Sequence, residues 1–276
     1  MEHRELGGSE VGKCYNRIMK KIIIGNWKMH PETSQEAEKW FSVVAKSIVG
    51  IKKTGVVVCP PFVYLSSLKK ISKKIILGAQ DSFVGDAGPF TGEVSSLMLY
   101  NLGARYVILG HSERRSPPTG GGESNELINR IIKSAIRSGL VPIICVGEKE
   151  RDLGHGYFEV VKTQVKECLK GVSKDSIAKI IIAYEPVWSI SSTANRRDAT
   201  PDDAREMAVF IRKILSDISS PEVAHSTRII YGGSVNGRDA EDFLKNGGIG
   251  GLLVGKASLV PEKFIEIVKI CEASNK

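Results

Sequence analysis

Eight short apolar runs, separated by amphipathic stretches, constrain the fold of this chain more than any other feature of its sequence. The runs cover residues 22–24, 56–59, 75–77, 106–109, 141–146, 180–183, 229–231 and 252–254. They are apolar at consecutive positions, as expected for strands that are buried on both faces. Alternating strands and helices indicate a parallel sheet, and eight such units in about 250 residues match the size of a (β/α)8 barrel.

A doubly wound open sheet is the alternative α/β fold. A dinucleotide-binding sheet of that kind would be expected to show G-x-G-x-x-G after its first strand, whereas the first run here is followed by GNWKM. This difference and the count of eight favour a single barrel domain over residues 19–276. Residues 1–18 have no periodic pattern, and we expect a disordered N-terminal extension or a misassigned start there.

Two of the stretches between the runs have clear helical features. Apolar residues at i, i+4, i+7 and i+11 form one face of the first predicted helix, namely Ala37, Phe41, Val44 and Ile48. Thr33 and Glu36 precede this face with capping-box spacing. The second predicted helix follows Thr200, where Pro201 suits the first helical position and the next two acids suit the positive helix end.

Composition narrows the class of function. The formal net charge is +8, but the basic residues are spread along the chain, which indicates a small anionic substrate or simple solubility rather than nucleic acid. The five cysteines are scattered, without C-x-x-C or zinc-ligand spacing, so we expect reduced thiols, a cytoplasmic location and no metal. No run of eighteen apolar residues predicts a membrane span, and residues 1–18 lack the apolar run of a signal peptide.

Polar residues follow several of the apolar runs, where a (β/α)8 barrel places its chemistry. Asn26 and Lys28 follow the first run, His111 and Glu113 the fourth, and Glu185 the sixth. Glycine-bearing segments, YGGS and VGKAS, follow the last two runs, where barrels commonly bind phosphate. Taken singly, each residue has a structural explanation, such as a solvated lysine. Together they predict a phosphate site, a cation, a carboxylate base and an imidazole on one rim.

Seven motifs, in this order and spacing, closely resemble the triosephosphate isomerase family: GNWKM, GAQD…FTGE, ILGHSERR, CVGE, AYEPVW, YGGSV and LLVGKASL. The resemblance extends from about Lys21 to about Cys271. It implies a TIM barrel that interconverts dihydroxyacetone phosphate and D-glyceraldehyde 3-phosphate in glycolysis and gluconeogenesis, without a cofactor or metal. The implied catalytic roles are Glu185 as base, His111 as neutral electrophile with a pKa lowered by the helix start, Lys28 as the positive charge, Asn26 as hydrogen-bond donor to substrate oxygen, and Glu113 as acidic neighbour.

The resemblance also implies a phosphate site and a lid. The phosphate-binding residues would be Ser191, Ser234, Gly255 and Lys256, and the lid with its contacts would be Pro186, Trp188, Ile190 and Tyr231. The family lid usually reads Ile-Gly-Thr-Gly-Lys before Ala-Thr-Pro, but here SSTANRRD separates Ile190 from Ala199, three residues longer and without glycine. Lys256 stands where a second glycine is usual. We therefore predict isomerisation with more phosphate elimination than a glycine lid would permit, and mainly solvated side chains for Arg196 and Arg197.

The segment from Gly78 to Glu93 predicts a homodimer or a higher homo-oligomer. It is long, and Phe90 near its tip is too apolar to remain in water. By resemblance it inserts into a second subunit, where Thr91 reaches the region of Asn26 and His111. Two other functions remain open from the sequence: a barrel lyase that eliminates phosphate from the same enediolate, and a non-catalytic barrel that binds a phosphorylated metabolite or a partner of its basic surface.

Overall fold

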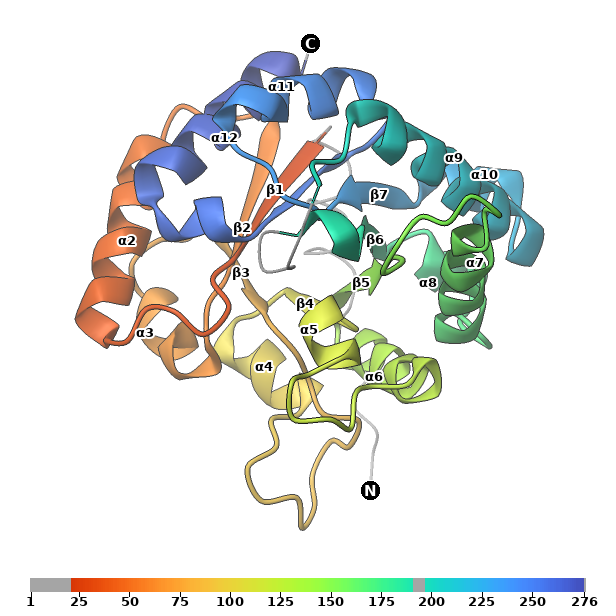
Figure 1. Ribbon diagram of the computed structural model, residues 1–276. Helices are drawn as coiled ribbons and strands as arrows, with labels where there is room; N and C mark the ends of the chain where they lie inside the picture. The colour runs from red at the N-terminus through yellow and green to blue at the C-terminus, as the bar shows by residue number, and fades with distance from the viewer. Residues whose placement is uncertain (1–20, 191–196, 276) are drawn as a thin grey trace.

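The computed structural model describes residues 21–190 and 197–275, which form a closed barrel of parallel strands (Figure 1). The strands are β1 (Lys21–Asn26), β2 (Thr54–Cys59), β3 (Ile76–Ala79), β4 (Tyr106–Leu109), β5 (Val141–Val146), β6 (Ile181–Tyr184), β7 (Arg228–Tyr231) and β8 (Gly251–Val254). Each strand pairs with the next one in sequence, and β8 closes the sheet against β1. All eight apolar runs are strands, so the predicted (β/α)8 barrel is confirmed.

Helices surround the barrel on its outside (Figure 1). They are α2 (Ser34–Ser47), α3 (Leu65–Leu68), α4 (Ser96–Leu102), α5 (Ser112–Arg115), α6 (Asn125–Arg137), α7 (Tyr157–Cys168), α8 (Lys174–Ile177), α9 (Pro201–Ile218), α10 (Pro221–Ser226), α11 (Gly237–Asn246) and α12 (Pro261–Ser274). Short 3₁₀ turns are η1 (Phe62–Tyr64), η2 (Val187–Ser189) and η3 (Lys256–Leu259). Among the described helices, none is both long and apolar enough to span a membrane.

Both predicted helix starts are confirmed. Thr33 caps α2 by accepting a hydrogen bond from the Glu36 N–H at 3.3 Å. Thr200 caps α9 in a full capping box, because its side chain accepts from the Asp203 N–H while the Asp203 carboxylate accepts from the Thr200 N–H. These bonds satisfy backbone donors that the first helical turn leaves without partners. The α9 cap fixes where the segment that follows β6 rejoins the barrel.

The strands separate two apolar cores, which explains why the runs are apolar at consecutive positions. Alternate residues point in opposite directions along a strand, so Ile22 and Ile24 fill the barrel interior while Ile23 packs toward the helices. The described cysteines Cys59, Cys145, Cys168 and Cys271 are buried free thiols in these cores. At the carboxyl ends of the strands the interior becomes polar, and this rim carries the candidate site. The expectation for residues 1–18 lies outside the described residues.

Candidate active site

The end of β1 places Lys28 in a backbone conformation that only tight support can maintain. Its φ of 52° lies in the left-handed region, which costs free energy for a residue with a side chain. The Lys28 N–H donates to Asn26 Oδ1 at 3.0 Å. The Gln80 amide donates to the Lys28 carbonyl at 2.7 Å and to the Cys59 carbonyl at 2.8 Å. Hydrogen bonds on both sides of the strained residue therefore fix the direction of its side chain.

The Lys28 ammonium forms an ion pair with Glu113 in the short helix α5. The pair joins the ends of β1 and β4, which the sequence analysis expected to meet. Glu113 is partly exposed, whereas the Lys28 side chain is three-quarters buried. The positive charge of Lys28 is thus held in place, and largely balanced, by a neighbouring carboxylate.

His111 is the N-cap residue of α5, and its hydrogen bonds define its tautomer. Its Nδ1 accepts from the Glu113 N–H at 3.2 Å. A ring nitrogen that accepts a hydrogen bond carries no proton, so this imidazole is neutral and bears its proton on Nε2. Nε2 lies 3.2 Å from Glu185 Oε1. The helix start therefore presents a neutral N–H donor to the pocket beside the carboxylate.

Glu185 follows β6 and is 2% exposed. Its backbone N–H donates to the Val146 carbonyl at 2.8 Å, and its Oε2 accepts from the Ser112 N–H at 3.2 Å. Gly232 leaves room for this side chain, since a Cβ there would lie 2.8 Å from Glu185 Cγ. Burial, together with the nearby Glu185 carboxylate, raises the pKa of the Cys145 thiol well above its ordinary value. The Glu185 carboxylate is therefore buried beside two donors, the Ser112 N–H and His111 Nε2, which offset the cost of burying it.

One small pocket brings the predicted proton-transfer residues and the predicted phosphate residues together. It is lined by Asn26, Lys28, His111, Glu185, Ile190, Gly232, Gly233, Ser234, Val235, Leu253, Gly255, Lys256 and Ala257. The segments after β7 and β8 thus face the ends of β1, β4 and β6, as a barrel rim requires. Ser191 lies outside the described residues.

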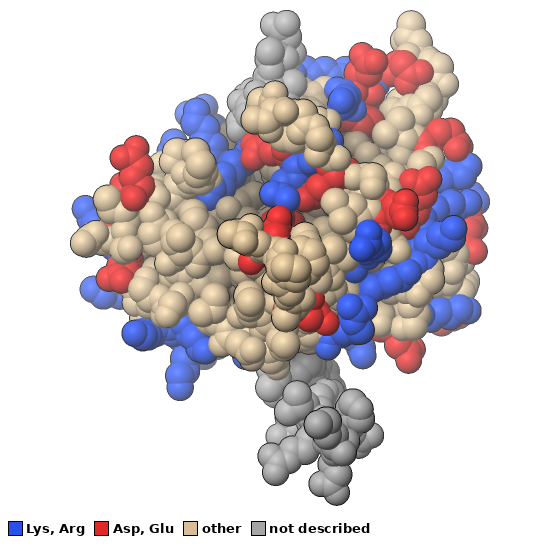
Figure 2. All heavy atoms as spheres, turned by 90° about the horizontal axis from the view of Figure 1, so that it is seen from below, with Lys and Arg blue, Asp and Glu red and all other residues tan. Residues whose placement is uncertain are grey.

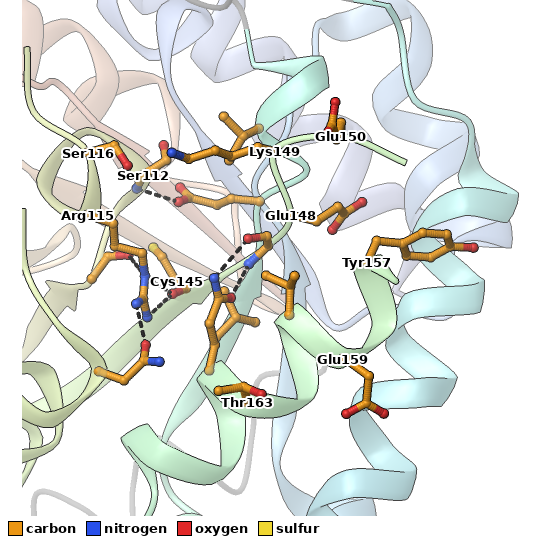
Figure 3. A pocket seen from close by; sticks show the side chains of 18 of the residues that line it. Ser112, Arg115, Ser116, Cys145, Glu148, Lys149, Glu150, Tyr157, Glu159 and Thr163 are labelled. Carbon is orange, nitrogen blue, oxygen red and sulfur yellow. Dashed lines mark hydrogen bonds between the residues drawn. The ribbon is translucent and has the colours of Figure 1, made fainter. Parts of the chain in front are cut away.

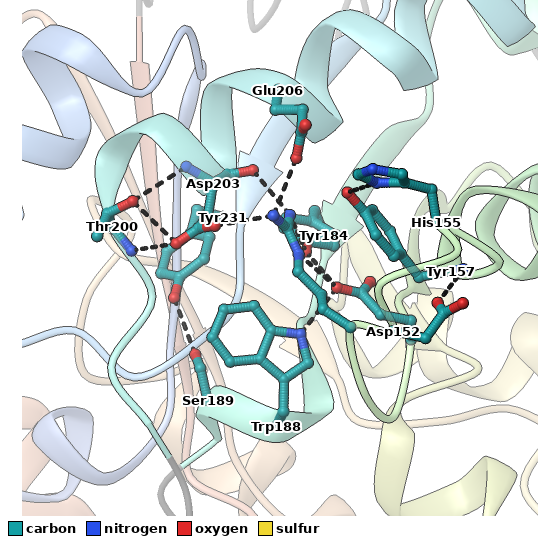
Figure 4. A network of polar contacts seen from close by, with 12 residues as sticks. Asp152, His155, Tyr157, Tyr184, Trp188, Ser189, Thr200, Asp203, Glu206 and Tyr231 are labelled. Carbon is teal, nitrogen blue, oxygen red and sulfur yellow. Dashed lines mark hydrogen bonds and ion pairs between the residues drawn. The ribbon is translucent and has the colours of Figure 1, made fainter.

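The predicted lid contacts form a polar network at the end of β6 (Figure 4). The Trp188 indole N–H and the Tyr184 hydroxyl both donate to Glu148 Oε1 at 2.8 Å. Ser189 Oγ lies 3.1 Å from the Tyr231 hydroxyl, which joins the segment to β7. Pro186 precedes η2 with φ of −62°. These contacts fix Trp188 against the barrel.

Arg151 connects this network to α9. Its guanidinium lies 3.3 Å from Glu148, 2.8 Å from Asp203 and 2.9 Å from Glu206 (Figure 4). It also lies over the Trp188 ring, 5.5 Å from the ring centroid. Because the Arg151 side chain is only 12% exposed, these charge pairs are partly desolvated and stronger than pairs on the open surface.

The expectation of a solvated Arg197 is confirmed in part, because its side chain is exposed but also contacts Trp188. Its guanidinium stacks over the Trp188 ring at 4.3 Å from the centroid, and its backbone N–H donates to the Trp188 carbonyl at 3.2 Å. The face of the Trp188 ring, which is only 7% exposed, offers a cation a favourable contact that periodicity cannot reveal. Arg196 lies outside the described residues.

The sequence analysis assigned no role to several residues that support the site. Gln80 and Glu148 lie inside the motifs GAQD and CVGE, and Ser112 lies inside ILGHSERR. The motifs were therefore a signal for these positions, although not for their partners. Arg151 lies in no quoted motif, and only its contacts in three dimensions reveal it.

A larger cavity of about 970 Å³ lies behind Glu185, between the end of β5 and helices α5 and α7. Figure 3 shows Arg115 and Cys145 on one side of it and Tyr157 and Glu159 on the other. Arg115 donates to the Cys145 carbonyl at 3.1 Å and to the Gly110 carbonyl at 2.7 Å. The cavity reaches Glu185 but is not lined by Lys28, His111 or Lys256. The small pocket is therefore the better candidate for substrate.

A closed barrel that places a buried carboxylate, a neutral imidazole and an anchored lysine at its strand ends belongs to the class of (β/α)8-barrel enzymes that use acid–base chemistry. The family model described as Triosephosphate isomerase matches residues 21–271. The chain belongs to the triosephosphate isomerase family.

Relatives with this name align over nearly the whole barrel. The triosephosphate isomerase of Dictyoglomus thermophilum is 46% identical over 255 residues, which cover 91% of this chain and 100% of the relative. Those of Caldanaerobacter subterraneus and Aquifex aeolicus are 44% and 42% identical, and each alignment covers 91% of this chain and 99% of the relative. The similarity therefore includes every strand of the barrel.

Proposed function

We propose that this isomerase interconverts dihydroxyacetone phosphate and D-glyceraldehyde 3-phosphate through an enediolate, in the cytoplasm, as a step of glycolysis and gluconeogenesis. One observation carries the proposal. Glu185 Oε1 and His111 Nε2 lie 3.2 Å apart, in a pocket that Lys28 also lines. A carbon acid needs a base and a hydrogen-bond donor for its oxygen in one water-poor site, and this pair supplies both.

Each proton has a carrier in this mechanism. The Glu185 carboxylate gives up the Ser112 N–H, takes a proton from one substrate carbon and returns it to the neighbouring carbon. His111 donates its Nε2 proton toward the carbonyl oxygen and exchanges protons between the two oxygens. Lys28 and Asn26 stabilise the negative charge that develops on these oxygens. Glu113 holds the Lys28 ammonium in place, and no cofactor or metal takes part.

The far side of the small pocket would hold the substrate phosphate. Ser234, Gly255 and Lys256 contribute backbone N–H groups there, and Ser191 would add one from the lid. Pro186, Trp188, Ile190 and Tyr231 would form the first hinge of this lid and its support. Because SSTANRRD replaces the glycine lid of the family, isomerisation is accompanied by some loss of phosphate from the enediolate.

A homodimer is supported by an exposed apolar surface. The Gly78–Glu93 segment projects from the barrel at the bottom of Figure 1, and Phe90 is 47% exposed. Leu97 and Met98 in α4 are about half exposed as well. Seen from this side, Figure 2 shows mainly tan residues at the centre with some Asp and Glu among them, and many of the Lys and Arg side chains toward the edge. A second copy would cover this surface, and its Thr91 would enter the hollow that Lys28 and Gln80 line.

A coupled isomerase assay tests the function, provided that inorganic phosphate is measured in the same reaction. We expect isomerised product to exceed released phosphate. A chain in which SSTANRRD is replaced by a short glycine lid is the control, and it should release less phosphate. Phosphate as the main product would make the chain a lyase instead. Substrate binding without turnover would make it a non-catalytic barrel.

A further inference from the structure

Lys256 differs from the other charged residues that line the small pocket, Lys28 and Glu185, because they have side-chain partners. It opens η3 directly after β8, on an exposed position. In the part of the chain that the structure describes, its ammonium has no ion pair or hydrogen bond with a side chain. Lys28 is paired with Glu113, and Glu185 contacts His111. Lys256 is thus the pocket-lining cation whose charge remains available.

The charges around the pocket show why such a cation matters. Glu113 offsets Lys28, His111 is neutral, and Glu185 must be ionised to act as a base. Without Lys256 the described site would carry a net negative charge when a phosphate ester enters. Such an ester carries a charge of about −1.5 to −2 at pH 7. Lys256 offsets the charge of the base and removes this net repulsion.

The position of Gly255 shows that the Lys28 stem lies close to the segment that carries Lys256. A Cβ added to Gly255 would lie 3.8 Å from Lys28 Cε. Only a side chain at Gly255 would bring the residue before Lys256 into van der Waals contact with this stem, so the glycine leaves a narrow space between them. An anion bound over Gly255 would lie within reach of both ammonium groups, and long lysine side chains adjust easily to such a ligand.

We propose that the Lys256 side chain binds the substrate phosphate and makes the site selective for dianionic over monoanionic phosphate groups. This inference rests on the proposed function. The family usually has glycine here, which leaves only backbone N–H groups as donors. This chain adds a full positive charge to them, on the side of the pocket where the lid also departs from the family. A second cation would strengthen phosphate binding in a chain whose lid sequence differs from that of the family.

The test compares Lys256→Gln and Lys256→Gly with Lys263→Gln, which removes an exposed lysine of α12 that does not line the pocket. Inorganic phosphate serves as the probe, by calorimetry and by competition with isomerisation. Both Lys256 variants should weaken phosphate binding and raise KM by about 3- to 30-fold, between the values for an exposed ion pair and a charged hydrogen bond, with kcat nearly unchanged. The loss should be larger at pH 8 than at pH 5.5, because a phosphate ester loses its second proton with a pKa of about 6, and both the ester and inorganic phosphate are mainly dianionic at pH 8 and mainly monoanionic at pH 5.5.

Lys256→Gly retains the backbone N–H, so it separates the contribution of the side chain to phosphate binding from that of the backbone. Phosphate affinity and KM within twofold of the unmodified chain in both Lys256 variants would overturn the proposal, and so would an equal loss in Lys263→Gln. An equal loss of phosphate affinity at pH 5.5 and pH 8 would contradict the proposed selectivity for dianionic phosphate. If the unmodified chain does not isomerise, the proposed function fails, but the calorimetric comparison still decides the role of Lys256. Thermal unfolding of each variant shows whether it is folded.

Discussion

The two sides of the pocket differ in how firmly their residues are held. On the proton-transfer side, Lys28, His111 and Glu185 each have polar partners, at distances of 3.2 Å or less for His111 and Glu185. On the phosphate side, Lys256 is exposed and Ser234 is half-buried, in glycine-bearing segments. The two departures from the expected family motifs that the sequence analysis names for the pocket, Lys256 and the longer lid, belong to this second side. The residues proposed for proton transfer are therefore the ones whose positions are held by hydrogen bonds and ion pairs.

Physical chemistry explains this difference. Proton transfer needs the two heavy atoms within hydrogen-bond reach, so a displacement of about 1 Å costs about 100-fold in rate. An anion can be held by several arrangements of N–H groups and cations, because Coulomb energy falls only gradually with distance. We therefore expect changes such as Lys256 or a longer lid to be tolerated on the phosphate side. The following predictions test this contrast.

Substitution of the base should have the largest effect. Glu185→Gln keeps the size of the side chain but removes the proton acceptor, so kcat should fall by about 10²- to 10⁴-fold. KM should change much less, in contrast to the Lys256 variants. Steady-state kinetics with thermal unfolding measures both. Glu159→Gln, at an exposed carboxylate of α7, is the control and should be fully active. Near-native turnover of Glu185→Gln would contradict the proposed base.

Removal of the support for Lys28 should have an intermediate effect. Gln80→Leu deletes the donor to the Lys28 and Cys59 carbonyls and lets the strained Lys28 backbone relax. We expect kcat to fall by about 10-fold and stability by about 1–3 kcal/mol. Gln164→Leu is the matched control, because Gln164 also forms two hydrogen bonds with backbone, to Gly147. Equal losses of kcat in both variants would show that the hydrogen bonds around Lys28 contribute no more to catalysis than those around Gly147.

The barrel and the meeting of its strand-end residues in one pocket could be predicted from the sequence because each depends on local signals. Strands buried on both faces leave consecutive apolar residues, and barrel geometry then brings residues at strand ends together. Asn26, Lys28, His111 and Glu185 follow from these two facts and from the motifs. The cap at Thr200 was also visible, since a capping box lies within four consecutive residues.

Contacts between distant segments could not be predicted in the same way. Arg151 meets Asp203 and Glu206 across more than fifty residues, and nothing in the local pattern specifies these partners. Arg197 is exposed, as expected, but it also stacks on the Trp188 ring, because an aromatic face attracts a nearby cation. Propensity and periodicity describe what a segment prefers alone, whereas these side chains respond to what the fold places beside them.

The proton-transfer side should also show a pH dependence of stability. Burial raises the pKa of Asp81, next to Gln80, to about 7, although Arg114 at 2.7 Å acts in the opposite direction. Between about pH 4 and pH 7 the folded chain then retains a proton that the unfolded chain has lost, so the free energy of unfolding falls as pH rises, by about 1–4 kcal/mol. Asp81→Asn should remove this slope in urea titrations. Identical slopes in both chains would contradict the raised pKa.

The smallest effect is expected where the phosphate side meets the lid. Arg197→Gln removes the cation from the Trp188 ring, a contact worth about 0.5–1 kcal/mol at an exposed site. The turn around Trp188 keeps its bond to Glu148 and its contact with Arg151, so kcat should fall by no more than about fivefold. The ratio of released phosphate to isomerised product should rise, because the two ends of the segment between Trp188 and Arg197 are less firmly joined. Trp188 fluorescence should shift as its ring becomes more exposed to water.

Arg205→Gln, at an exposed arginine paired with Asp202, is the control and should change neither readout. A phosphate ratio that is unchanged in Arg197→Gln, although the fluorescence shifts, would show that the stacking is structural and that the phosphate side does not depend on it.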